Sequence, residues 1–312
     1  MSDVMTGAND PLEGLLPEEF SSIEWTPAPP TVASPSWMGG DSLFFEGRSN
    51  AGLPLLVRVL RPAATIRVDR AAMFAAMDAA GSAGLAPTVL YHDASHGVCV
   101  EEKLDDGWQI ATLYRLLDPR AWRASLHARH RFHELAPDLP FVSVFEQITM
   151  LLAYARDNAV EIPPVAQQVI AAVEEARACV RGGPEPVACH GDGAVSNLML
   201  SSGEARLVGW TQAGRMDPLE EIGSVLTELA PFVAGDATIF EAAWGDRDPV
   251  ASARAHLYGL ADDLRWGLIG SCARALEPDS PIEYQRYGSW RLFKARFAVA
   301  HGQVDRLMRE AS

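Results

Sequence analysis

One strand-rich stretch, residues 187–210, interrupts a long series of helical patterns and constrains the fold of this chain more than any other segment. It reads VACHGDGAVSNLMLSSGEARLVGW. An apolar strand end leads into His190, Gly191 and Asp192, and a polar SSGE turn then separates NLML from ARLVGW, which is typical of a β-hairpin. The chain must therefore fold as a mixture of helices and strands, with a polar loop placed beside a hairpin.

The register of this hairpin brings polar side chains together. If residues 201–204 form the turn, Asn197 lies opposite Val208, and the loop that carries Asp192 converges on the same edge. A carboxylate and an amide placed in this way suit a base that positions a nucleophile beside a metal ion. The same spacing also fits a surface hairpin whose Asp and Asn only cap turns.

Strand patterns dominate the part of the chain before residue 107. Residues 42–60 indicate extended segments around turns, with a buried strand near the end. Asp69 is placed to cap a helix over 70–80. Residues 84–104 then indicate two short strands around a polar turn. These elements predict a small β-rich lobe.

Helical patterns dominate the remainder, and the expected helices lie at 109–136, 142–158, 163–180, 217–230, 250–275 and 282–310. Residues 1–36 are rich in proline and lack apolar periodicity, so we expect a loosely attached N-terminal lead-in segment. The expected organisation is thus a lead-in segment over 1–36, a small lobe over 37–107 and a larger, mainly helical lobe over 108–312. This is an α+β, two-lobed architecture.

The charge and cysteine content restrict the classes of partner and the compartment. The 312 residues include 26 Lys and Arg against 41 Asp and Glu, a net charge of −15, which disfavours binding to nucleic acid or anionic lipid. The four cysteines are scattered without metal-ligand spacing, and no stretch has the length of a membrane span. We expect a cytoplasmic protein without nucleic-acid or membrane partners; the sequence does not indicate its oligomeric state.

Several motifs together resemble one family of kinases. The H-G-D motif, an Asn after four intervening residues, the hairpin, V-x-W and A-G-x-x-D-P resemble the catalytic region of aminoglycoside-phosphotransferase-like kinases. Three further stretches resemble the choline/ethanolamine kinase family more closely: LLVRVLRP, AGLAPTVLYHDASHGVCVEE, and LRWGLIG followed by PIEYQRYGSWR. The resemblance covers about residues 37–308 and implies a bilobal, protein-kinase-like fold.

For the catalytic loop, the resemblance implies a role for each matching residue. Asp192 would be the base that orients a substrate hydroxyl, and His190 and Gly191 would shape the loop around it. Asn197 would ligate a magnesium ion. Phosphoryl transfer depends on such positioning and charge neutralisation more than on covalent chemistry.

For the nucleotide, the resemblance implies ATP as cofactor together with magnesium. Arg58 would contact the phosphates from its strand, and Gly39 and Gly40 would belong to a turn that covers them. Arg58 also fits a residue alternating out of the strand, and the glycine pair also fits an ordinary turn.

The chain departs from the family pattern at the metal. Where the family has Asp-Trp-Glu after the hairpin, this sequence has Gly209, Trp210 and Thr211. The helix glutamate that pairs with the phosphate-contacting base falls on Met73, and the asparagine that follows the glycine turn falls near Leu43. Loss of the metal carboxylates should slow phosphoryl transfer by orders of magnitude.

Other acidic residues could in principle replace the missing carboxylates. Glu204, Glu220 and Glu221 are the candidates for a rearranged metal site. Asp217 instead begins a D-P-L-E-E helix start, and we expect it to cap that helix rather than bind metal. The histidines at 127, 130 and 133 lie among arginines on one helix, so we expect a solvated helix with a structural role for His133.

Aromatic residues near the C-terminus fit a cation site. Tyr284 and Tyr287 share a helix face with Arg291, and Trp266 lies on a preceding helix. The resemblance implies that these aromatic residues hold an ammonium group, and we expect their pocket to open toward Asp192. Ordinary core packing fits them equally well. We expect Arg291 to pair with an acid such as Glu283 or Asp262 and to point away from the pocket.

Three functions remain open at this point. The first is a catalytically impaired relative of choline/ethanolamine kinases, a pseudokinase, that binds a small molecule or a partner in its cleft. The second is an active ATP-dependent kinase for choline, ethanolamine or another small alcohol, with an altered metal site. The third is a structural protein with a collapsed cleft. The replacements at 209 and 211 favour the first.

Overall fold

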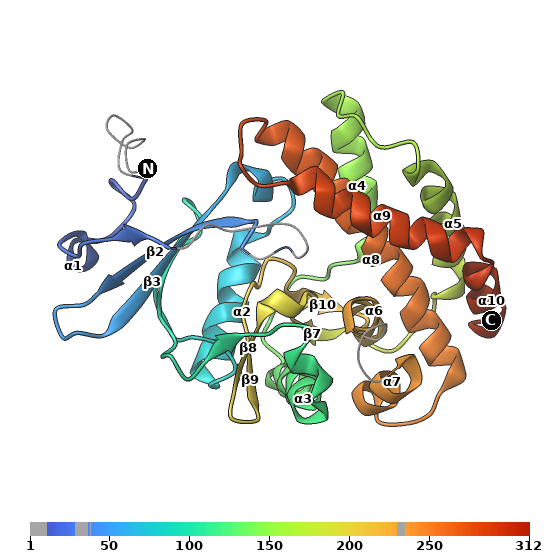
Figure 1. Cartoon of the computed structure of the whole chain (residues 1–312), viewed down its shortest axis with the longest axis horizontal. Helices are drawn as coiled ribbons and strands as arrows, with labels where there is room; N and C mark the ends of the chain where they lie inside the picture. The colour runs from blue at the N-terminus through green and yellow to red at the C-terminus, as the bar shows by residue number, and fades with distance from the viewer. Residues whose placement is uncertain (1–10, 29–36, 38, 230–234) are drawn as a thin grey trace.

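A five-stranded antiparallel sheet and a mainly helical body form the two lobes of the chain (Figure 1). The computed structural model describes residues 11–28, 37, 39–229 and 235–312. The predicted α+β, bilobal, protein-kinase-like fold is confirmed.

The sheet of the small lobe has the order β1-β2-β3-β5-β4. Its strands are β1 (Thr26–Pro27), β2 (Ser42–Arg48), β3 (Pro54–Leu60), β4 (Val89–Asp93) and β5 (Val98–Glu102). Leu55 and Val57 of β3 point into a small apolar core, since alternate residues of a strand share one face. This alternation leaves Arg58 on the opposite face, toward the large lobe.

One helix packs against this sheet, as its sequence predicts. Helix α2 (Arg70–Ser82) begins where the carboxylate of Asp69 accepts a hydrogen bond from the backbone N–H of Ala72, at 3.0 Å. Such a cap satisfies one of the unpaired N–H groups of the first turn. Met73 and Phe74 then lie in the core, with the other apolar residues of the same face.

The segment before the small lobe is more closely attached than its composition predicts. Helix α1 (Glu18–Ser21) precedes β1, which pairs with β2 at the edge of the sheet. Leu12 and Phe20 are buried against the same apolar core. Residues 11–28 therefore extend the small lobe, while 29–36 lie outside the described residues.

The large lobe is built around one long, buried helix. Its helices are α3 (Pro119–Leu135), α4 (Val144–Asp157), α5 (Ala166–Cys179), α6 (Pro218–Leu229), α7 (Asp236–Trp244), α8 (Pro249–Leu276), α9 (Tyr284–Ala300) and α10 (Gln303–Glu310). Helix α8 packs against α4, α6 and α9 (Figure 1). Because α8 is surrounded, its sequence is apolar on nearly every face.

The helices differ from the predicted ones in three places. Residues 109–118 form the short strand β6 (Gln109–Ile110) and a 3-10 turn, and α3 begins only after them, at Pro119. Helix α7 was not predicted. The single helix expected over 282–310 is divided between α9 and α10, because Gly302 has a φ of +67°, in the left-handed region that ends helices.

Two small sheets hold the loop with the H-G-D motif. The predicted hairpin is formed by β8 (Leu198–Ser201) and β9 (Glu204–Leu207), and β6 pairs with β8. Strands β7 (Val187–Cys189) and β10 (Gly214–Met216) pair on the other side of the loop. The loop of residues 190–197 therefore lies between these two small sheets, on the side of the large lobe that faces the small lobe.

Within the described residues, no helix has both the length and the apolar character needed to cross a bilayer.

Candidate functional site

A cavity of about 420 Å³ lies between the two lobes. It is bounded by the glycine turn, strands β2 and β3, the connecting segment 101–106 and the β8–β9 hairpin. Among the residues singled out from the sequence, Gly39, Gly40, Arg58 and Asn197 line it. Its volume is that of a small-molecule site.

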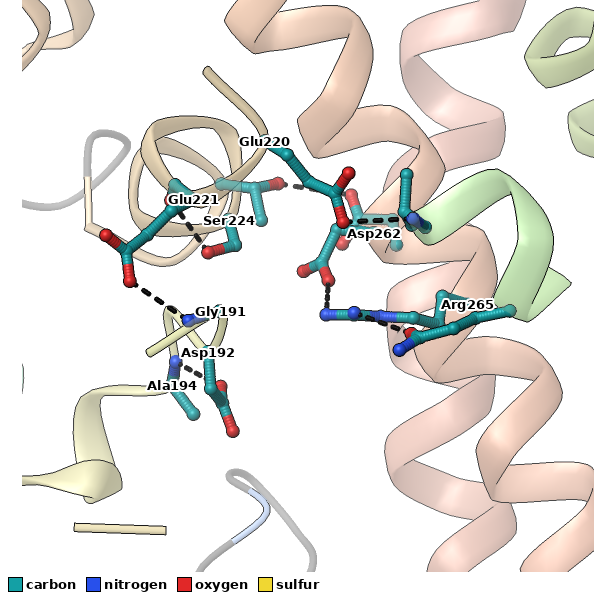
Figure 2. A network of polar contacts seen from close by, with 12 residues as sticks. Gly191, Asp192, Ala194, Glu220, Glu221, Ser224, Asp262 and Arg265 are labelled. Atoms are coloured by element: carbon teal, nitrogen blue, oxygen red, sulfur yellow. Dashed lines mark hydrogen bonds and ion pairs between the residues drawn. The ribbon is translucent and has the colours of Figure 1, made fainter. Parts of the chain in front are cut away.

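Asp192 is almost completely buried on a loop that faces α6 and α8 (Figure 2), and it is not among the residues that line the cavity. Its Oδ1 accepts a hydrogen bond from the N–H of Ala194 at 2.8 Å, and its Oδ2 accepts one from Nδ2 of Asn197 at 2.7 Å. Burial raises the pKa of Asp192. Both oxygens of the predicted base are therefore engaged within the loop.

His190 holds the loop in shape. Its Nε2 lies 2.8 Å from the carbonyl oxygen of Val208, and its Nδ1 lies 3.3 Å from a guanidinium nitrogen of Arg129. Burial, helped by the charge of Arg129, lowers the pKa of His190 to about 4. The ring is therefore neutral at pH 7, donates from Nε2 to Val208, and joins the loop to the end of the hairpin.

A buried ion-pair network, which the sequence analysis missed, supports the same loop. Glu221 accepts hydrogen bonds from the N–H of Gly191 at 3.0 Å, from Arg129 at 3.1 Å and from His133 at 2.6 Å. Burial would raise the pKa of Glu221, but His133 and Arg129 hold it well below its usual range. Gly191 has a φ of +74°, and a Cβ there would lie 2.4 Å from the carbonyl oxygen of Gln212, so only glycine fits.

The same network brings together groups that can ligate metals. Ligand atoms of His133, Cys189 and Glu221 lie within 4.8 Å of one another. The guanidinium of Arg129 already neutralises Glu221, and burial raises the pKa of the Cys189 thiol well above its usual value. His133 therefore has the structural role that was predicted for it, whereas the expectation of a solvated helix is wrong at Arg129, which is 4% exposed.

Side chains of this chain fill the space of the missing metal carboxylates. A Cβ on Gly209 would lie 2.3 Å from Oδ1 of Asn197, so the amide of Asn197 occupies the position toward which an Asp side chain would point. Thr211 donates a hydrogen bond of 3.0 Å from its Oγ1 to Oδ2 of Asp41. The amide of Asn197 donates its hydrogen bond to Asp192.

Asp41, which the sequence analysis did not single out, is the carboxylate that Thr211 contacts. Its Oδ1 accepts hydrogen bonds from Nε1 of Trp37, at 2.9 Å, and from Arg67, and its Oδ2 accepts from Thr211. Arg67 neutralises its charge. Magnesium needs several hard oxygen ligands, and among the described residues this end of the cavity does not assemble such a set.

The acidic residues considered as replacement metal ligands lie outside the cavity or make other contacts. Glu204 is exposed at the hairpin turn. Glu220 accepts a hydrogen bond from the N–H of Val144 at 2.9 Å, and Glu221 belongs to the arginine network. The predicted cap is confirmed, since Asp217 accepts from the N–H of Leu219 at 2.9 Å. None of these four acids lines the described cavity.

Arg58 finds its partner on a neighbouring strand instead of on the helix. It lies 3.6 Å from Oε1 of Glu101 on β5, and both side chains are buried. Burial raises the pKa of Glu101. Met73, at the position where the resemblance implies a glutamate, is part of the core. Nε of Arg58 is buried and has no hydrogen-bond partner among the described residues.

The expected aromatic pocket is closed. Trp266, Tyr284 and Tyr287 are each at most 2% exposed, and they do not line the cavity. The indole of Trp37 lies among them, at ring-centroid distances of 5.1, 5.3 and 5.3 Å respectively. The prediction that these three residues line a pocket open toward Asp192 is therefore wrong, because Trp37 fills the space.

Arg291 is ion-paired as predicted. Its guanidinium lies 2.6 Å from Asp262, 2.5 Å from Asp263 and 2.5 Å from Glu228. The predicted pairing of Arg291 with Asp262 is confirmed. Glu283, the other candidate, pairs with an exposed arginine of α9. Three acids around one buried guanidinium fix α8, α6 and α9 to one another.

The geometry agrees with comparisons to known proteins. The sequence model of the phosphotransferase enzyme family matches residues 41–257. A choline/ethanolamine kinase family protein from Mesorhizobium loti is 21% identical, with a TM-score of 0.71 over 96% of this chain and 95% of that one. No curated protein sequence matches the chain.

Two further solved structures have the same fold. Choline kinase LicA from Streptococcus pneumoniae is 16% identical, with a TM-score of 0.72 over 92% of this chain and 99% of that chain, and LicA has also been solved in complex with AMP. An ethanolamine kinase from Plasmodium vivax is 14% identical, with a TM-score of 0.67 over 90% of this chain and 84% of that chain.

Proposed function

Since this chain belongs to the phosphotransferase enzyme family, we propose that it is a catalytically impaired, choline/ethanolamine-kinase-like member that acts by binding a small molecule in its interlobe cavity. One observation carries this proposal. The amide of Asn197, which would ligate magnesium, donates to Asp192 instead and occupies the space beside Gly209.

The chemistry of phosphoryl transfer makes this arrangement unfavourable for catalysis. Charge on the transferring phosphate has to be neutralised, and magnesium supplies most of that neutralisation in the family. Here Arg58 and Lys103 are the cations among the described residues that line the cavity, and Arg58 already shares its charge with Glu101. Both oxygens of Asp192 are engaged by Ala194 and Asn197, so the predicted base is also not free to orient a substrate hydroxyl.

The cavity itself supports the binding function. It keeps a volume of about 420 Å³, and apolar side chains such as Phe44, Leu56 and Met199 form much of its wall. A flat heteroaromatic ring fits such a surface. The AMP complex of LicA makes an adenine nucleotide the first ligand to test. The open cavity argues against a purely structural protein with a collapsed cleft.

Thermal unfolding with ATP, with and without magnesium, tests the proposal. We expect any rise in Tm at millimolar ATP to be the same in the presence of magnesium or of EDTA, because a ligand stabilises by RT ln(1 + [L]/Kd) and magnesium should leave this Kd unchanged. LicA, measured in parallel, is the positive control for a magnesium-dependent rise. A magnesium-dependent rise of several degrees in this chain would contradict the proposal and favour an active kinase for a small amino alcohol.

A further inference from the structure

Three side chains with different metal-ligating atoms meet beside the H-G-D loop, outside the interlobe cavity. Within the part of the chain that the structure describes, ligand atoms of His133, Cys189 and Glu221 lie within 4.8 Å of one another. They come from three elements, namely α3, the end of β7 and the first turn of α6. Cys189 and Glu221 are almost completely buried, whereas the side chain of His133 is 20% exposed. None of the three residues lines the cavity.

The two oxygens of Glu221 have different partners. Oε1 accepts hydrogen bonds from the N–H of Gly191, at 3.0 Å, and from Arg129, at 3.1 Å (Figure 2). Oε2 lies 2.6 Å from Nε2 of His133. Hydrogen bonds to one oxygen orient a carboxylate so that the other can ligate a metal ion. Oε2 is therefore the oxygen that can face an ion, and Arg129 can keep its place at Oε1.

The spacing of the sulfur and the imidazole fits a tetrahedral zinc ion. Sγ of Cys189 lies 3.5 Å from Nε2 of His133. Zinc bonds of about 2.3 Å to sulfur and about 2.0–2.1 Å to nitrogen, at a tetrahedral angle, place these two atoms roughly 3.5–3.6 Å apart. The distance from Nε2 to Oε2 would have to widen to roughly 3.3–3.5 Å. A small shift of the partly exposed imidazole supplies that widening.

The donor set selects the kind of metal. A thiolate, an imidazole and a carboxylate suit zinc and similar thiophilic cations, whereas magnesium prefers oxygen ligands alone. Three protein ligands leave a fourth position, which a water can fill from the exposed side of His133. On binding, Cys189 releases its thiol proton to solvent. Nε2 of His133 gives up the proton that it donates to Oε2, and the ring keeps one at Nδ1.

We propose that His133, Cys189 and Glu221 form a binding site for one thiophilic divalent cation, with Zn²⁺ as the expected ion. Cys189 directly precedes the H-G-D motif, and Glu221 holds the N–H of Gly191. The bound ion therefore ties the loop that carries Asp192 to α3 and α6 without contacting Asp192. This site lies apart from the cavity, so the inference goes beyond the proposed function and does not depend on it.

Titration of the full chain with Co²⁺ tests the inference, because Co²⁺ substitutes for Zn²⁺ and its absorption spectrum reports the ligands. A cobalt–thiolate bond gives a charge-transfer band in the near ultraviolet. The solution contains no nucleotide, and a phosphine keeps the cysteines reduced without adding a thiol. The variants are Cys189→Ser and His133→Asn. The matched controls are Cys179→Ser, at a half-buried cysteine of α5, and His130→Ala, at an exposed histidine of α3.

We expect the wild type and both controls to bind one Co²⁺ per chain, with a thiolate band that Zn²⁺ removes and Mg²⁺ does not. Cys189→Ser should lose the band, and His133→Asn should bind Co²⁺ at least about tenfold more weakly. Absence of the band in the wild type, or its persistence in Cys189→Ser, would overturn the inference. If circular dichroism shows that Cys189→Ser does not fold, His133→Asn decides, and an affinity equal to that of the wild type overturns the inference.

The outcome is separate from that of the nucleotide experiment. Magnesium-dependent ATP binding would contradict the proposed function and leave the cobalt spectrum unchanged. Failure to bind Co²⁺ or Zn²⁺ would remove this site and leave the proposed function as it stands.

Discussion

Oγ1 of Thr211 and Oδ2 of Asp41 are joined by a hydrogen bond of 3.0 Å although 170 positions separate the two residues in the chain. The bond connects the glycine turn of the small lobe to the segment between β9 and β10, at the position where the resemblance implies a metal-binding glutamate. A glutamate at 211 would bring a second carboxylate against Asp41. The threonine and the aspartate therefore depend on each other, and the change at 211 is more than the loss of a ligand.

Restoring the two family carboxylates should therefore fail to restore metal binding. In Gly209→Asp/Thr211→Glu, the new Cβ at 209 would lie 2.3 Å from Oδ1 of Asn197, and the new glutamate would face Asp41. Breaking the Asn197–Asp192 hydrogen bond and adding like charges should lower the free energy of unfolding by about 1–3 kcal/mol. We expect calorimetry to detect no magnesium-dependent gain in ATP affinity.

A further change separates the two obstacles. Adding Asp41→Asn to the double variant removes the like-charge contact and weakens the hold on the glycine turn. We expect this triple variant to bind Mg·ATP more tightly than the double variant. If the double variant already binds Mg·ATP, the prediction is wrong, and the loss of the carboxylates at 209 and 211 was the only obstacle to metal binding.

The Arg58–Glu101 pair gives a second prediction, on stability. Both side chains are buried, and Nη2 of Arg58 lies 3.6 Å from Oε1 of Glu101. Glu101→Leu therefore leaves the guanidinium of Arg58 without its counter-charge. Removing one member of a buried pair typically costs about 3–5 kcal/mol, whereas replacing both by apolar residues is often close to neutral. We expect Glu101→Leu to reduce the free energy of unfolding by that amount, and Arg58→Leu/Glu101→Leu to reduce it much less, both measured by urea denaturation.

An exposed pair on the same sheet provides the control. Lys103 and Glu46 lie 2.6 Å apart but are 41% and 34% exposed, so Lys103→Ala should change stability by about 1 kcal/mol or less. If Glu101→Leu is as mild as Lys103→Ala, the buried pair does not hold β3 and β5 together as the structure indicates.

The sequence predicts those parts of the fold that depend on neighbouring residues. Capping chemistry determines the role of Asp69 at the start of α2. The hairpin that places Leu200 opposite Ala205 follows from a two-residue turn at Ser202 and Gly203, both of which have positive φ. Such features need no knowledge of the tertiary structure. They were sufficient to locate Asp192 and Asn197 on one loop.

The remaining features depend on contacts between distant residues. The partnership of Arg58 with Glu101 follows from the register of β3 and β5, and that of Arg129 with Glu221 joins two helices 92 positions apart. Trp37 lies beside a proline-rich segment without periodicity, so nothing local indicates that its indole fills the recess around Trp266. The closed aromatic site was missed for that reason.

Glu220 leads to a prediction about pH. It is buried on α6, and burial raises its pKa from the ordinary value of 4.5 to about 8. Between these two values the folded chain binds a proton at Glu220 that the unfolded chain has released, so the contribution of this group to stability is complete below about 4.5 and is lost as the pH rises toward 8. In Glu220→Gln the amide oxygen can still accept from the N–H of Val144, but nothing titrates.

We therefore expect Glu220→Gln to be more stable than the wild type at alkaline pH. Since each pKa unit corresponds to about 1.36 kcal/mol, the advantage should be on the order of 2–4 kcal/mol near pH 8 and should vanish toward pH 4.5. Thermal or urea unfolding of both proteins across this range measures it. Glu146→Gln, an exposed acid on the adjacent α4, should follow the wild type throughout. Parallel pH profiles for the wild type and Glu220→Gln would mean that Glu220 remains ionised in the folded chain, with Arg265 supplying the compensating charge.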